Sequence, residues 1–276
     1  MKCSAYWWVL LAAISVIGCG GGEDRTAGVS PGSAGPATTA VEQPPEASAA
    51  FPQDKATAAI TGKILFDGDP PPRAEIPAEK VAAAKDQFCI QHHGSSPLLS
   101  EDLIVSSDKA IRNAVVYVKS FPQKWTHATP ADAVRITQHN CQFAPHVVGL
   151  MTGQNLIVAS DDATAHNVHF MAQRNRIRKG NVTMAKGEEL EADFKRPELG
   201  TAYFKCDIHS WMRSYTCVFE HPFFAVTGDD GAFELGKLPP GEYEIEAWHE
   251  TLGTQQKKLT LRQGETVSAD FSFKQQ

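Results

Sequence analysis

Three side chains that bind soft metals lie close together in the segment KCDIHSWM, residues 205–212. Cys206, His209 and Met212 offer a thiolate, an imidazole and a thioether, each three residues after the last. A second imidazole, His166, lies about 40 residues upstream, inside the strand-like stretch AHNVHF. Thiolate and thioether ligands suit Cu(I), and imidazole also suits Cu(II). The segment could therefore be a metal site, a redox thiol or a chance cluster, and the elements that carry these residues decide which.

Strand alternation predicts that the donors meet. Successive side chains of a strand point to opposite faces, so His166 shares a face with Val168 and Phe170. In the stretch TAYFKC, Cys206 shares a face with Phe204 in the same way. Large apolar side chains point into a core, which places both donors at the inner ends of their strands. The two donors that follow Cys206 lie on a loop too short to travel far, so we expect all four at one end of a sandwich.

Two imidazoles, one thiolate and a weak axial thioether favour copper held for electron transfer. A β frame limits movement of the ligands, and burial keeps water from the metal and raises its potential. A c-type haem needs Cys-x-x-Cys-His, which is absent, and zinc rarely recruits methionine. The remaining alternative is a free buried cysteine beside unrelated histidines. The sequence predicts one copper ion, bound by His166, Cys206, His209 and Met212.

The N-terminus predicts export. An apolar run that is too short to span a bilayer reaches Gly18, so we interpret residues 1–18 as a signal peptide. Gly18 before Cys19 resembles a bacterial lipobox, which implies lipidation of Cys19 and a membrane-anchored lipoprotein on the periplasmic or outer surface. A plain signal peptide is the alternative. Residues 19–57, rich in Gly, Ala, Pro, Ser and Thr, predict a disordered tether.

The rest of the chain predicts an all-β protein. Many short β-type runs separated by turn residues favour sandwiches, and the only helical candidate covers residues 78–87. The formal net charge of −6 makes nucleic acid an improbable partner. No Ser-His-Asp, paired-acid or phosphate-loop signature stands out, so no enzymatic activity is expected.

Two segments resemble known families. FAVTGDDGAFELGKLPPGEYEIEAWH resembles the carboxypeptidase regulatory-like domain, a prealbumin-like sandwich. The matching early strands, residues 61–66 and 114–118, lie about a hundred residues before this segment, too far for one loop. We therefore expect residues 58–130 and 221–276 to form this sandwich, with a second domain, residues 131–220, inserted between them.

The inserted segment resembles the cupredoxins. FAPHVVGLMTGQNLIVASDDATAHNVHF is similar to their approach to the first ligand, and GTAYFKCDIHSWMRSYTCVF has the Cys-x-x-His-x-x-Met spacing of the amicyanin members. The resemblance implies a Greek-key sandwich with His166, Cys206 and His209 as equatorial ligands and Met212 as the axial ligand of a type 1 copper. It also implies that Asn167 hydrogen-bonds across the ligand loops. Asp207 and Ile208 stand where these loops usually carry Thr and Pro, and a negative charge at Asp207 would favour Cu(II) and lower the potential.

The other cysteines leave alternatives open. An exported protein keeps disulfides, so we expect Cys89 and Cys141 to pair. They could instead belong to a second metal site with the histidines at positions 92, 93 and 146, or both could be free. Cys217 lies on a strand and is expected to be a buried free thiol.

These features together predict a lipid-anchored carrier of single electrons. The edge of His209 would be the electron port, and Ile208 and Trp211 would form a small apolar surface for a transient redox partner. Two other functions stay open. One is a copper-binding or storage lipoprotein without a redox partner, and the other is a metal-free structural or carbohydrate-binding surface protein.

Overall fold

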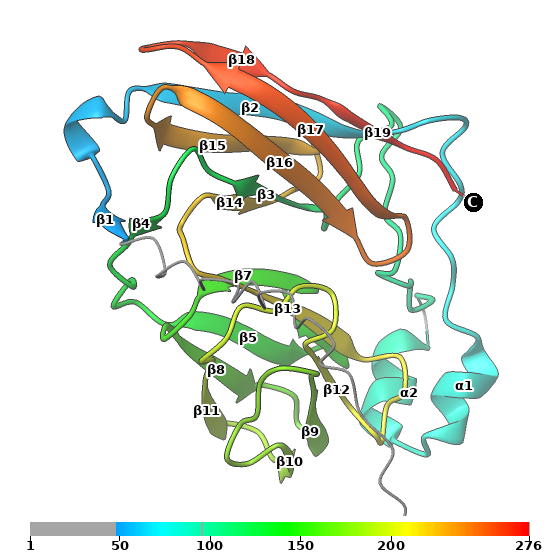
Figure 1. Ribbon diagram of the computed structural model, residues 1–276. Helices are drawn as coiled ribbons and strands as arrows, with labels where there is room; N and C mark the ends of the chain where they lie inside the picture. Colours follow the sequence, from blue (N-terminus) through cyan, green and yellow to red (C-terminus); the bar gives the residue numbers. More distant parts are fainter. Residues whose placement is uncertain (1–47, 95, 276) are drawn as a thin grey trace, which may run out of the picture. The chain divides into compact units, whose positions relative to one another are not determined.

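The computed structural model describes residues 48–94 and 96–275, and its regular elements are mostly strands (Figure 1). The all-β class and the sandwich architecture predicted from the sequence are confirmed. The predicted signal peptide, the lipidation site Cys19 and most of the predicted tether lie outside the described residues. None of the helices in the described residues has the length and hydrophobicity needed to span a membrane.

The first sandwich pairs a five-stranded sheet, in the order β10-β9-β12-β13-β7, with a four-stranded sheet, in the order β11-β8-β5-β6. Most neighbours are antiparallel, but β13–β7 and β5–β8 are parallel. Its strands are β5 (Val134–His139), β6 (Gln142–Ala144), β7 (Val147–Met151), β8 (Asn155–Ser160), β9 (His166–Met171), β10 (Asn181–Met184), β11 (Glu189–Asp193), β12 (Tyr203–Lys205) and β13 (Arg213–Phe219).

Alternating apolar residues hold the first sandwich together. Leu156 and Val158 of β8 pack in one buried cluster with Val168 and Phe170 of β9 and with Phe204 of β12, so the two sheets share a core. The alternation predicted for β9 and β12 is therefore observed, and it turns the other side of each strand away from this core.

The second sandwich is built from strands that precede and follow the first in sequence. Its sheets have the orders β14-β3-β16-β17 and β15-β2-β18, with β19 also paired to β2. The strands are β2 (Ala58–Phe66), β3 (Val115–Ser120), β14 (Phe224–Val226), β15 (Ala232–Leu238), β16 (Gly241–His249), β17 (Gly253–Leu261), β18 (Thr266–Ser268) and β19 (Phe271–Phe273). Nearby are the short parallel pair β1 (Ala49–Ala50) and β4 (Trp125–Thr126) and the 3-10 turn η1 (Gln53–Lys55).

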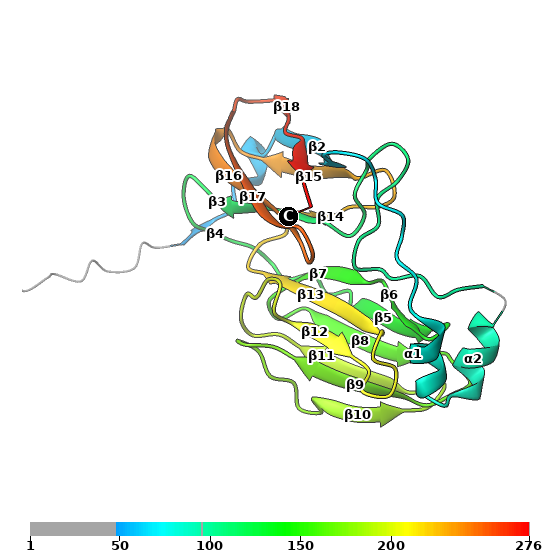
Figure 2. The same ribbon diagram turned by 90° about the vertical axis from the view of Figure 1, so that its right-hand side faces the viewer.

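A third buried cluster joins the two sandwiches. Val115 of β3 and Trp248 of β16 pack against Val147 of β7 and against Tyr215 and Phe219 of β13. Figures 1 and 2 both show β7 and β13 on the side of the first sandwich that faces the second. This buried apolar contact lies on the side of the first sandwich that is opposite to β10 and β11.

The predicted single helix over residues 78–87 is wrong in extent. The structure has two short helices, α1 (Ala78–Ala83) and α2 (Gln87–His93). Lys85 between them has a positive φ of 55°, which stops α1, and the carboxylate of Asp86 caps α2 by accepting a bond from the Cys89 amide. Both helices lie beside one end of the first sandwich, close to the loop after β12 (Figure 2).

Candidate metal centre

Pairing between two strands brings the first two predicted donors together. β9 and β12 are antiparallel neighbours, so β9 begins at the same end of the sheet at which β12 ends. His166 is the first residue of β9 and Cys206 directly follows β12. The Asn167 amide donates to Cys206 Sγ at 3.3 Å, which fixes the sulfur beside the start of β9.

The loop after β12 folds back and returns the second imidazole to the same point. The His209 amide donates to Cys206 Sγ at 3.3 Å, and the Met212 amide donates to the His209 carbonyl at 2.9 Å. The Cys206 amide in turn donates to the Met212 carbonyl at 3.2 Å. Met212 is buried in the same cluster as Cys206, so its backbone closes the loop that carries both other donors.

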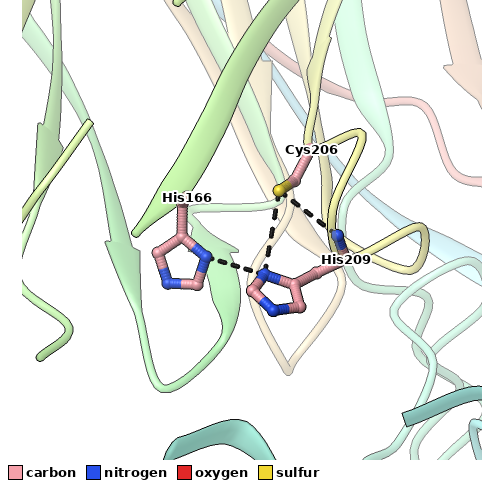
Figure 3. A group of neighbouring side chains, drawn as sticks. All are labelled: His166, Cys206 and His209. Atoms are coloured by element: carbon pink, nitrogen blue, oxygen red, sulfur yellow. Dashed lines mark hydrogen bonds between the residues drawn. The ribbon is translucent and has the colours of Figure 1, made fainter. Parts of the chain in front are cut away.

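The three side chains converge in a buried space (Figure 3). Nδ1 of His166 lies 2.9 Å from Nδ1 of His209, and Cys206 Sγ lies 3.8 Å from the latter. The two imidazoles are fully buried and the cysteine is 2 % exposed. One donor atom from each residue lies within 4.8 Å of the others, so a single ion could reach all three.

The surroundings shift the pKa values of Cys206 and His166. Burial opposes ionisation of Cys206, but hydrogen bonds from His166, His209 and two backbone amides outweigh it and lower the pKa of the thiol to about 6. Burial also opposes a charge on His166, but its bond to Asp162 and its contact with Cys206 raise the pKa of the imidazole to about 9. A thiolate is the form of cysteine that binds metal, so Cys206 is prepared as a ligand.

Of the two residues predicted to surround the donors, Asn167 makes the expected contact and Asp207 has charged or polar partners that were not expected. Asn167 Oδ1 accepts a bond from the Asp207 amide at 3.1 Å, the link across the ligand loops that the resemblance implies. Asp207 lies at the surface, with its carboxylate 2.8 Å from Lys205 Nζ and 2.8 Å from His169 Nδ1. These two contacts offset much of its negative charge, so its influence on Cys206 is weaker than the sequence suggests.

The edge of His209, which we predict to be the electron port, is covered in the structure. His209 Nε2 lies 3.2 Å from Asp86 Oδ2 and 3.6 Å from Cys89 Sγ, both at the start of α2. Ile208 is 43 % exposed, but Trp211 is half-buried and its Nε1 donates to the Cys141 carbonyl at 2.8 Å. The two residues therefore do not form one apolar surface around an open imidazole.

Cys89 and Cys141 form a disulfide that joins α2 to the turn after β5. The pairing removes the alternative in which these cysteines bind a second metal. Within the described residues the free cysteines are Cys206 and Cys217, both buried. Burial raises the pKa of Cys217 to about 12, so this thiol stays protonated and unreactive.

Sequence reasoning missed two carboxylates that contact the imidazoles. Asp162 Oδ2 lies 2.7 Å from His166 Nε2, and Asp86 Oδ2 faces His209 Nε2 as described above. Burial raises the pKa of each carboxyl, but hydrogen bonds outweigh it and lower both pKa values below the ordinary range. Asp162 stands four residues before His166, a spacing that could have drawn attention to it, whereas no local pattern connects Asp86 with the loop after β12.

The donor set fits copper. Both rings contact carboxylates through Nε2, and their Nδ1 atoms face each other beside the Cys206 sulfur, which leaves two imidazole nitrogens and one thiolate around one buried point. Two imidazoles with a thiolate suit copper in either oxidation state. Copper bound there would supply one-electron chemistry, while His166, Cys206 and His209 would hold it and the apolar side chains of the cluster would exclude water.

The chain is similar to solved structures of copper proteins at low identity. No family model matches the chain, and no curated protein matches it. Similar solved structures include a Cu-containing nitrite reductase from Thermus scotoductus SA-01, with 17 % identity over 38 % of this chain and 25 % of that chain, at a TM-score of 0.29. A purple cupredoxin from Nitrosopumilus maritimus has 17 % identity over 31 % and 99 % of the two chains, at a TM-score of 0.27. Amicyanin from Paracoccus versutus has 20 % identity over 38 % and 97 %, at a TM-score of 0.28. This chain spans about a quarter of the nitrite reductase, and we base the function on the site geometry.

Proposed function

We propose that this protein is a mononuclear type 1 copper protein that carries single electrons outside the cytoplasm, anchored to a membrane by lipid on Cys19. The observation that carries the proposal is the convergence of His166 Nδ1, His209 Nδ1 and Cys206 Sγ in a buried space. Met212 would be the weak fourth ligand, and a transient redox protein would be the partner. No substrate would be turned over.

The proposal gives the two sandwiches different roles. Residues 131–220 would be the copper-binding domain, inserted into a carboxypeptidase regulatory-like sandwich made of residues 58–130 and 221–276. The second sandwich would serve as a mount that presents the copper domain to its partner. Its two sheets are held together by one large apolar cluster.

One equivalent of Cu(II) added to the purified apoprotein tests the proposal. We expect strong absorption toward the red from charge transfer between the Cys206 thiolate and Cu(II), and loss of this band in Cys206→Ala. Cys217→Ala is a matched control, because Cys217 is also a buried free thiol but lies outside the site, and the band should persist there. A colourless wild-type protein would overturn the proposal.

The covered His209 edge favours a second candidate, a copper-storage protein without a redox partner. Asp86 and Cys89 occupy the surface through which an open imidazole would exchange electrons. Voltammetry separates the two functions. Fast, reversible oxidation and reduction of the bound copper supports the carrier, and tight copper binding without reversible electron exchange supports storage.

A further inference from the structure

Two aspartates contact the two imidazoles at Nε2, on the side of each ring away from its Nδ1. Asp162 Oδ2 lies 2.7 Å from His166 Nε2, and Asp86 Oδ2 lies 3.2 Å from His209 Nε2. Asp162 is 2 % exposed and the Asp86 side chain is 11 % exposed, so both contacts are largely shielded from water. We call Asp86 and Asp162 the aspartate pair.

The disulfide connects the two aspartates to each other. Asp86 Oδ1 accepts from the Cys89 amide at 3.2 Å, and Asp162 Oδ2 accepts from the Cys141 amide at 2.8 Å. Cys89 and Cys141 are bonded through their sulfurs, so each aspartate is fixed to one half of the disulfide. Thr164 Oγ1 also donates to Asp86 Oδ2 at 2.5 Å, which links this carboxylate to the loop between β8 and β9.

The aspartate pair sets which nitrogen of each ring faces the metal. A carboxylate accepts hydrogen bonds, so Asp162 holds a proton on Nε2 of His166, and the negative charge of Asp86 beside Nε2 of His209 favours a proton there. A metal binds the neutral imidazole, which has one N–H, and when this proton stays on Nε2 the lone pair lies on Nδ1. The Nδ1 atoms of the two rings face each other at 2.9 Å, and His209 Nδ1 lies 3.8 Å from Cys206 Sγ, so the carboxylates favour the arrangement that a metal requires.

We propose that Asp86 and Asp162, linked by the Cys89–Cys141 disulfide, are positioning residues that direct Nδ1 of both histidines at the copper and close the outer edge of His209. This inference rests on the proposed copper function. Each carboxylate also strengthens the imidazole that it contacts as a donor, which favours Cu(II) over Cu(I). The pair would therefore hold the potential down, in opposition to the effect of burial.

The variants Asp162→Asn and Asp86→Asn remove one charge each and keep nearly the same shape. Outer contacts of this kind typically contribute about 10–100-fold to metal affinity. We expect a loss in that range for Cu(II) in Asp162→Asn, measured by competition with a chelator, and a smaller loss for Cu(I). Each tenfold difference between the two losses raises the potential by about 59 mV. Asp86→Asn should have a smaller effect, because its contact is longer and more exposed.

Asp161→Asn is the matched control, because Asp161 is the exposed neighbour of Asp162 and its amide bonds to the Gln138 carbonyl. It should bind copper like the wild type. Circular dichroism of the apoproteins checks that each variant folds, and if Asp162→Asn does not fold, Asp86→Asn decides by the same criteria. Folded variants of the aspartate pair that match the wild type in Cu(II) affinity and potential would overturn the inference.

A measurement without copper separates this inference from the proposed function. In the metal-free protein, nuclear magnetic resonance should find slowly exchanging Nε2 protons on both His166 and His209. The His166 signal should be lost in Asp162→Ala, and the His209 signal in Asp86→Ala. Wild-type protein with both signals and no copper binding would contradict the proposed function alone, and the absence of protected Nε2 protons would contradict the positioning role alone.

Discussion

The two sandwiches each bury a histidine at the end of a strand, and the two histidines are treated in opposite ways. His166, at the start of β9, bonds to a carboxylate, and its pKa is raised to about 9. His249, at the end of β16, is 1 % exposed, and burial together with the nearby positive charge of His146 lowers its pKa to about 4. Both rings are buried at the end of a strand, so the neighbours decide the difference.

The two histidines differ in whether other polar groups lie around the buried ring. In the second sandwich the ring of His249 stays neutral and is one more packed side chain. In the first sandwich His166 meets another imidazole and a thiolate, and the aspartate pair compensates the cost of burying them. The candidate metal centre therefore differs from other buried polar residues because its donor side chains converge and carboxylates offset the cost of burying them.

The largest effects are expected when one core aromatic residue in each sandwich is replaced with alanine. Phe204 and Phe271 are both fully buried, and replacing either with alanine should cost about 3–5 kcal/mol of the free energy of unfolding. Phe204 stands two residues before Cys206, so Phe204→Ala should also weaken copper binding, while folded Phe271→Ala should keep the wild-type copper spectrum. Denaturant titration and visible spectra check this, and equal damage to copper binding in both variants would contradict a site confined to the first sandwich.

Removing the disulfide should have the next largest effect. The double variant Cys89→Ser, Cys141→Ser loses a cross-link over a separation of 52 residues, which typically costs about 2–5 kcal/mol. It also releases α2 from the edge of His209, so the Nε2 proton of this ring should exchange with water faster. Thermal unfolding and hydrogen exchange measure the two effects. Unchanged protection of His209 in a destabilised protein would show that α2 covers the ring without the disulfide.

The lowered pKa of His249 predicts that the free energy of unfolding depends on pH through the second sandwich. His249 has a folded pKa of about 4, below the ordinary 6.5, so its contribution to stability is present above pH 6.5 and is lost as the pH falls toward 4. The loss can reach about 3 kcal/mol. The variant His249→Gln cannot bind this proton, so its free energy of unfolding should fall less over the same range. Parallel curves for the two proteins would rule out a buried neutral His249.

The smallest effect is expected at Asp207. Its carboxylate is 40 % exposed and contacts both Lys205 and His169, so water and two partners reduce its influence on the site. Asp207→Asn should raise the copper potential, but by less than Asp162→Asn. Voltammetry of the two variants gives the order, and a larger shift at Asp207 would mean that surface charge outweighs the buried aspartate pair.

The sequence predicts the local parts of this molecule well. Alternation in β9 and β12 places His166 and Cys206 on the inner face, and the short loop brings His209 to them, because each of these statements depends on a few neighbouring residues. The cover over His209 could not be predicted, since Asp86 lies more than a hundred residues from this ring in sequence and α2 shows little apolar periodicity of its own. A disulfide and one capping carboxylate hold α2 there, and both act through the tertiary fold.

X-ray absorption of the copper-loaded wild-type protein tests the central claim most directly, since it reports the atoms bound to the metal. The account predicts one copper per chain, with one sulfur from Cys206 and two imidazole nitrogens in the strong positions, and loss of that sulfur in Cys206→Ala. A copper surrounded by nitrogen and oxygen alone, or a sulfur signal that survives Cys206→Ala, would contradict it.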